Sequence, residues 1–181
     1  MKLEMRALKN IAAAAMTLAV VFGAASLKPV TANAAEASVS ASIEEENSYI
    51  SFQDEAYQNE FLRRVNNERA KAGLKPVQLG DSNHNSAAQE RAEEIATVNS
   101  HVRPNGTKWY TVLSEYGVTD AAAGENAAWG SVSPEEVVNA WMNSEGHRAN
   151  ILNPEARKMS VGYYYNSNST WGHQWIQLFT K

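Results

Sequence analysis

Apolar side chains recur with the helical period in three stretches of the chain, residues 52–72, residues 81–98 and the segment that begins at Pro134. In the second stretch the apolar face consists mainly of alanine, which indicates close packing of that helix against a neighbour. Gly73 follows the first stretch, at the position where helices often end in a left-handed residue. The pattern therefore predicts three main helices.

The third helix has a well-specified start. Ser133 is placed to cap it, Pro134 suits the first helical position, and Glu136 completes a Ser-x-x-Glu capping box. Val132 and Val137 are spaced as a hydrophobic staple across this start. We therefore expect the residues that follow the helix to lie at fixed positions relative to the core.

The C-terminal part of the chain has the pattern of a β-hairpin. Residues 159–165 and 171–180 carry the mixed apolar and aromatic side chains typical of buried strands, and the polar residues 166–170 between them predict a turn. The second strand is apolar on both faces, with Trp175 on one and Ile176 on the other. Helices on both sides of a sheet would explain this, so we expect an α+β fold, a three-layer α-β-α sandwich with an antiparallel central sheet.

The N-terminal region has the parts of a secretory signal. Residues 1–34 comprise a basic start, an apolar middle and a small-x-small cleavage site at Ala32 and Ala34. The apolar part is short and rich in alanine for a bilayer core that needs about 20 residues, which favours cleavage after Ala34 over a retained anchor. Residues 35–50 have the composition of a disordered linker, and residues 51–181 form one domain. We expect a secreted, extracellular protein without membrane attachment once the signal is removed.

The charge and the cysteine content of the chain exclude several classes of partner and site. Loss of the leader leaves 12 basic and 19 acidic side chains, a net charge of −7, so nucleic acid and anionic membranes are poor partners. The chain has no cysteine, which excludes disulfides and any cysteine-based metal or redox site. We expect a monomer that is held together by its core.

Candidate chemistry lies in three polar stretches outside the apolar pattern. His101 falls in a turn-rich segment, Glu125 follows Gly124, and His147 comes after the third helix. His84 is interpreted as an exposed polar residue near a helix start, and His173 as packing or decoration of a rim. The open question is whether the three polar stretches meet.

Over residues 57–180 the chain resembles the CAP (SCP) superfamily of cysteine-rich secretory proteins, antigen 5 and pathogenesis-related 1 proteins, and is most similar to its short bacterial branch without disulfides. The resemblance rests on the order and spacing of short motifs, among them Val-Asn-Asn-Glu-Arg at 65–69, Gly-Glu-Asn at 124–126, Gly-His-Arg-Ala-Asn-Ile-Leu at 146–152 and Trp-Ile-Gln-Leu-Phe at 175–179.

The resemblance implies a cleft where two histidines and two acidic residues converge, and where some members bind a divalent cation. By position, His101 and His147 match the histidines and Glu125 matches the first acid. Ser144 stands in the place of the second acid, with Glu145 one residue out of register. The expected cleft residues are therefore His101, Glu125, Asn126, Ser144, Glu145 and His147.

Three interpretations of this cleft stay open. His101, Glu125 and His147 suit a divalent cation such as zinc, with one coordination position left for water or ligand. A histidine oriented by Glu125 also suits proton transfer without metal, and a purely structural hydrogen bond between the same groups is the third possibility.

The sequence has no His-Glu-x-x-His pair, Gly-x-Ser-x-Gly elbow or phosphate-binding glycine loop, so no residue is assigned as catalytic. We therefore expect a secreted CAP-domain binding or interaction module whose cleft takes zinc, another divalent cation, or a small or lipid-like ligand. Its partner would be extracellular or part of a cell envelope. The alternative is an extracellular hydrolase that uses His and Glu or a metal.

Overall fold

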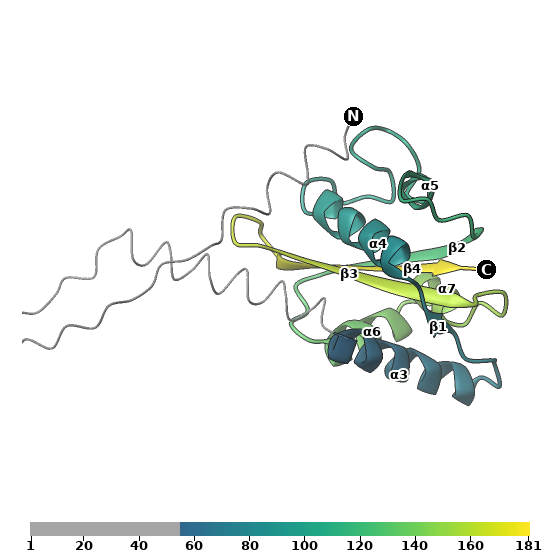
Figure 1. The fold of residues 1–181 in the computed structure, drawn as a ribbon. Coiled ribbons are helices and arrows are strands. Elements are labelled where there is room, and N and C mark those ends of the chain that lie inside the picture. Colours follow the sequence, from purple (N-terminus) through teal and green to yellow (C-terminus); the bar gives the residue numbers. More distant parts are fainter. Residues whose placement is uncertain (1–54) are drawn as a thin grey trace, which may run out of the picture. The chain divides into compact units, whose positions relative to one another are not determined.

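The computed structural model describes residues 55–181, so the predicted signal peptide and linker lie outside the described residues. Figure 1 shows how the helices and strands are arranged. The elements are α3 (Glu55–Lys71), β1 (Gln78–Leu79), α4 (Ser82–Ile95), α5 (Thr111–Glu115), β2 (Ala122–Trp129), α6 (Pro134–Met142), α7 (Glu145–Ile151), β3 (Lys158–Asn166) and β4 (Gly172–Thr180). Within residues 55–181, no helix has the length and apolar character required to cross a membrane.

The fold is the predicted α-β-α sandwich. The sheet has the strand order β1-β3-β4-β2, with α4 and α5 on one face and α3, α6 and α7 on the other (Figure 1). The long strands β3 and β4 form the predicted hairpin, and β2 pairs antiparallel with β4. The short strand β1 pairs parallel with β3, so the sheet is mixed and not purely antiparallel as expected.

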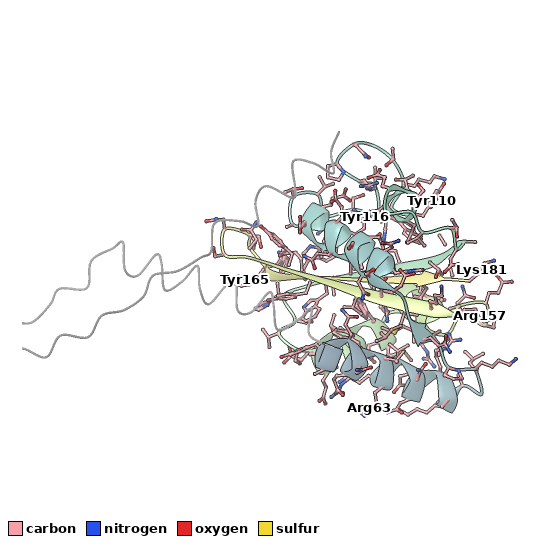
Figure 2. The ribbon with its side chains drawn as sticks, viewed as in Figure 1. Arg63, Tyr110, Tyr116, Arg157, Tyr165 and Lys181 are labelled. Carbon is pink, nitrogen blue, oxygen red and sulfur yellow. The ribbon has the colours of Figure 1, made fainter. Side chains whose placement is uncertain are left out.

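The two faces of β4 belong to different cores, as its sequence pattern predicts. Trp175 and Phe179 pack into the core under α3 and α6, where Trp141 is also fully buried. Ile176 and Leu178 pack into the second core, under α4 and α5. The outer surfaces of the helices remain polar, as Arg63 on α3 illustrates in Figure 2. The sheet is therefore buried on both sides, and its edges are where polar groups can reach solvent.

The start and stop signals of the helices are largely confirmed. Gly73 ends α3 with a φ of +71°, and the Ser133 hydroxyl accepts a hydrogen bond from the Glu136 backbone N–H. The Glu136 carboxylate reaches back to the N–H of Val132, one residue before the cap. Val132 is 56% exposed, so the predicted staple does not bury it.

Strand β2 is the largest element that the sequence pattern missed. Its sequence, Ala-Ala-Gly-Glu-Asn-Ala-Ala-Trp, is poor in the β-branched residues that favour strands. Side chains from the α6–α7 region compensate by capping alternate carbonyls along this edge strand. Trp141 donates to Ala127 O at 3.2 Å, Asn150 to Glu125 O at 2.9 Å, and Asn153 to Ala123 O at 3.0 Å. These contacts protect an edge that would otherwise present unpaired backbone groups.

The interpretation of His84 as an exposed residue is wrong. Its imidazole is buried, with Nδ1 2.8 Å from an Asp81 oxygen and Nε2 3.1 Å from an Asp120 oxygen. Asp120 also accepts a hydrogen bond from Lys158. Because Asp120 lies 36 residues away in sequence, local pattern could not reveal this contact, which ties the start of α4 to the segment before β2.

Helix α4 lies very close to β3, as its alanine-rich face predicts. The point of closest approach is Gly162, where an added Cβ atom would collide with the backbone carbonyl of Ala88. By contrast, a Cβ at Gly146 in α7 would meet no atom within 4 Å.

This contrast gives a prediction about stability. We expect Gly162→Ala to lower the free energy of unfolding by about 1–3 kcal/mol, because backbone atoms cannot move aside as a flexible side chain can. The matched change Gly146→Ala should raise it by about 0.5–1 kcal/mol through helix propensity. Urea unfolding monitored by circular dichroism would measure both, and equal effects in the two variants would contradict this account of the α4–β3 contact.

Candidate functional site

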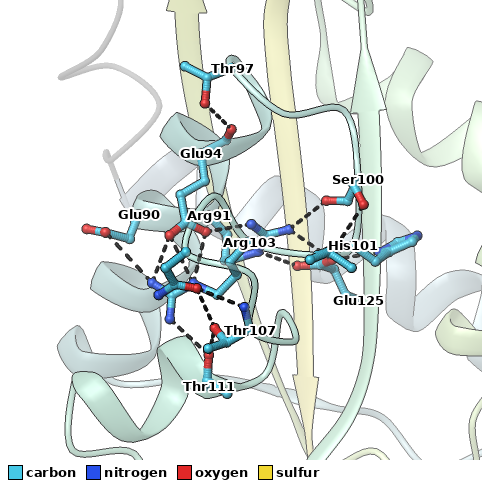
Figure 3. Close-up of polar contacts among 12 residues, drawn as sticks. Glu90, Arg91, Glu94, Thr97, Ser100, His101, Arg103, Thr107, Thr111 and Glu125 are labelled. Carbon is cyan, nitrogen blue, oxygen red and sulfur yellow. Dashed lines mark hydrogen bonds and ion pairs between the residues drawn. The ribbon is translucent and has the colours of Figure 1, made fainter.

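His101 and Glu125, two of the predicted site residues, are in direct contact. His101 lies in the segment between α4 and α5, and its Nδ1 is 2.7 Å from Glu125 Oε1 (Figure 3). Glu125 comes from β2, and its side chain is only 1% exposed, whereas that of His101 is 59% exposed. The carboxylate therefore fixes one edge of the imidazole and leaves the Nε2 edge for other contacts.

Arg91 is a contact of Glu125 that the sequence did not assign to the cleft. Its fully buried guanidinium donates from Nε to Glu125 Oε2 at 2.8 Å and from Nη2 to Glu125 Oε1 at 3.3 Å (Figure 3). The sequence does hold a signal, because Arg91 lies within the apolar stripe of α4, between Ala88 and Ile95. A charged residue on a buried face calls for a partner of opposite charge.

A second buried arginine anchors the segment that carries His101. Arg103 donates to both carboxylate oxygens of Glu94, at distances from 2.8 to 3.1 Å (Figure 3). It also donates to both oxygens of Glu115, at 2.6 and 3.2 Å. Glu94 also accepts a hydrogen bond from Arg91. The backbone two residues after His101 is thus fixed to α4 and α5, which limits where the imidazole can lie.

His147 reaches the site from the opposite helical layer. Asn126 points to the other face of β2 from Glu125, because neighbouring residues of a strand alternate sides. Its amide donates to His147 O at 3.1 Å, and its own oxygen accepts from Asn150 at 2.8 Å. These bonds attach the first turns of α7 to the strand, so His101 and His147 approach β2 from the two sides of the sheet.

The two histidines have opposite electrostatic environments. The hydrogen bond from His101 to Glu125 raises the pKa of His101, although burial works against it. Burial, together with the positive charge of His101, lowers the pKa of His147. The His101–Glu125 bond therefore stabilises the fold fully below about pH 6.5, the ordinary histidine value, and less as pH rises through the raised pKa of His101.

The structure does not bring Ser144 and Glu145 into contact with Glu125. Ser144 occupies the N-cap position of α7 without a side-chain capping bond, and Glu145 is exposed in the first turn. Glu145 instead lines a separate groove of about 490 Å³ together with Met142, Asn143, Arg148, Ala149 and Leu152.

The three residues expected to hold a metal do not fit that role as they stand. Both oxygens of Glu125 are engaged by Arg91, and Oε1 is also engaged by His101. Among residues 55–181, no group of three or more His, Cys, Asp or Glu side chains is arranged to hold a metal ion. The described geometry instead places the exposed imidazole of His101 on a buried and charge-compensated carboxylate, with the backbone of His147 attached to the next residue of β2.

Comparison with known proteins gives the family. The model of the family described as "CAP: Cysteine-rich secretory protein family" matches residues 62–179, more than half of the chain. The chain belongs to this CAP family. The resemblance inferred from the sequence motifs is thereby confirmed, and the absence of cysteine agrees with a branch that has no disulfides.

Two curated relatives come from Bacillus subtilis (strain 168). The CAP chain is 41% identical over 123 residues to "Uncharacterized protein YkwD", covering 67% of this chain and 47% of the relative. It is 32% identical over 116 residues to "Uncharacterized membrane protein YlbC", covering 61% of this chain and 33% of the relative. The match thus spans less than half the length of each of these relatives.

Solved structures share the fold. An outer surface protein from Borrelia burgdorferi has a TM-score of 0.57 at 22% identity, covering 66% of this chain and 88% of that chain. An extracellular protein containing an SCP domain from Bacillus anthracis has a TM-score of 0.56 at 24% identity, covering 69% of this chain and 42% of that chain. At these identities the likeness establishes the fold alone.

The contrast between the histidines can be measured directly. In an NMR pH titration of the imidazole protons, we expect His101 to titrate above, and His147 below, the ordinary histidine midpoint of about 6.5. Glu125→Gln should lower the His101 midpoint, because the hydrogen bond to a carboxylate is the main cause of its shift. His173, whose pKa is lowered by burial on β4, serves as the control and should not respond. An unchanged His101 midpoint in the variant would refute this assignment.

Proposed function

We propose that this CAP domain is an exported binding module that takes a small polar or lipid-like ligand at His101 and His147, over the edge strand β2. The observation that carries the proposal is the fixed attachment of both residues combined with imidazole edges left unoccupied. Glu125 holds the His101 ring, and Asn126 holds the backbone of His147. Among the described residues, the side-chain contact that holds His147 uses its backbone oxygen and not its imidazole, which suits a ring that receives a ligand.

Export is supported by two observations. The first 34 residues have the pattern of a secretory signal. The solved structures of similar fold include one described as an extracellular protein and one described as an outer surface protein. We therefore propose that the partner is an extracellular molecule or a component of a cell envelope. The acidic mature chain argues against nucleic acid.

Binding is a better fit than hydrolysis because the residues around the histidines lack the parts of a catalytic set. Glu125 is buried and its two oxygens already contact Arg91 and His101, so the carboxylate is not placed to reach a substrate. Within residues 55–181, no serine or threonine hydroxyl forms a hydrogen bond with the imidazole of His101 or His147. An activated nucleophile beside a base, which covalent hydrolysis requires, is therefore missing from this described region.

The first test is turnover. Native protein and the variants His147→Ala and Glu125→Gln, each checked for folding by circular dichroism, would be assayed with p-nitrophenyl esters and a fluorogenic peptide mixture. We expect no activity in the native protein above that of the variants. A native activity that disappears in both folded variants would instead establish the hydrolase alternative.

The second test is ligand retention. The full chain would be purified after export from its host, and the small molecules extracted from it would be compared by mass spectrometry with those from a His101→Ala/His147→Ala variant. We expect a compound that is retained by the native protein and lost from the double variant. His173→Ala is the matched control because it removes a histidine from β4 and should retain the compound. Equal recovery from all three proteins would contradict ligand binding at this site.

A further inference from the structure

The guanidinium of Arg91 is held on every side by acceptors. Its Nε and Nη2 donate to the two oxygens of Glu125, its Nη1 donates to Glu94 at 2.5 Å, and Nη2 also donates to Ser100 O at 3.1 Å. The side chain is 0% exposed. Withdrawing the guanidinium from Glu125 would leave a buried charge without its partner, which is strongly unfavourable. Arg91 and Glu125 therefore form a stable buried ion pair.

A guanidinium and a divalent cation compete for the same part of a carboxylate. Both bind its oxygen lone pairs, and a cation placed on Glu125 would lie within a few ångströms of the positive charge of Arg91. The imidazole of His101 already contacts Oε1 of Glu125, and the backbone of His147 is attached to Asn126, the next residue of the strand. Two histidines and a carboxylate are ligand types that zinc uses, and Arg91 already binds both oxygens of that carboxylate.

We propose that Arg91 determines the ligand class of this site by occupying Glu125 as a built-in cation, and that it thereby keeps divalent metals from using His101, Glu125 and His147 together. This inference goes beyond the proposed function, since it holds whatever ligand the histidines receive. It makes the native site one that recognises ligands by hydrogen bonds from imidazole, while removal of Arg91 would free the carboxylate of Glu125 for a divalent ion.

The chain offers a matched control in Arg103. This arginine is also buried, at 3% exposure, and shares Glu94 with Arg91. Its hydrogen bonds go to Glu94, Glu115 and Thr111 and not to Glu125 or His101. Removing either guanidinium takes one buried positive charge from the same network, but only the removal of Arg91 vacates Glu125.

The experiment is a zinc titration by calorimetry of the metal-stripped full chain in four forms: native, Arg91→Met, Arg103→Met and Arg91→Met/Glu125→Gln. Methionine keeps much of the length of arginine and removes its charge. We expect Arg91→Met to bind one zinc ion about 10- to 100-fold more tightly than the native chain, the range by which groups around a metal site alter affinity. Arg103→Met should bind as the native chain does, and the double variant should lose the gain.

Thermal unfolding with and without zinc accompanies the titration, because both single variants lose a buried ion pair and are expected to be less stable. An ion that binds only the folded state raises the melting temperature. We expect zinc to raise it in Arg91→Met, or to refold that variant if it is unfolded alone, and to leave Arg103→Met unchanged.

Three results would overturn the proposal. The first is native binding as tight as that of Arg91→Met. The second is an Arg91→Met chain that neither binds zinc more tightly nor refolds in its presence. The third is an equal gain in Arg103→Met, which would mean that loosening of the network, and not the freeing of Glu125, creates the affinity. Each result is independent of the retention and turnover assays, so the proposed function and this inference can fail separately.

Discussion

The buried ion pair between Arg91 and Glu125 is the interaction on which the rest of the site depends. Glu125 faces the α4 layer from an edge strand, where an ionised carboxylate without a partner would be costly. Arg91 supplies that partner from the middle of α4, and the remaining accepting capacity of Glu125 is used by His101. The position of the exposed histidine is thus a consequence of how the buried charge is satisfied.

Strand β2 is also held along its free edge, by side chains from α6 and the residues after it. Its outward carbonyls are capped by Trp141, Asn150 and Asn153, all from the segment that begins with α6. Gly124 fits this arrangement because a Cβ there would lie 2.7 Å from the Asn150 side-chain oxygen. The motif around His147 therefore performs two tasks, since it covers the edge of the sheet and delivers a histidine to it. Both histidines of the site are therefore attached to neighbouring residues of β2, His101 through Glu125 and His147 through Asn126.

The sequence predicted the parts of the fold that depend on local periodicity. It failed where contacts with residues distant in sequence determine the structure. The capped start at Ser133 and the two-faced strand with Trp175 and Ile176 are local patterns, and both are confirmed. Strand β2 has little intrinsic preference for its conformation and is specified by pairing and by side-chain caps, so its sequence pattern was uninformative. His84 was misjudged for the same reason, because Asp120 comes from a distant segment. For the site, the motif resemblance placed His101, Glu125 and His147 in one cleft, but it assigned no role there to Arg91, the partner of Glu125.

The charge network also explains how a domain without cysteine restrains its longest connection. Residues 96–110 join α4 to α5 without helix or strand, and a segment of this length is costly to order. A disulfide could restrain such a segment, but this chain has no cysteine. Arg103 takes that role by joining Glu94, before the segment, to Glu115, after it. Burial opposes the charge of Arg103, yet the two carboxylates raise its pKa further above the ordinary arginine value, so the guanidinium stays charged at any physiological pH. The restraint on the segment that carries His101 is therefore independent of redox conditions, because it rests on ion pairs and not on a disulfide.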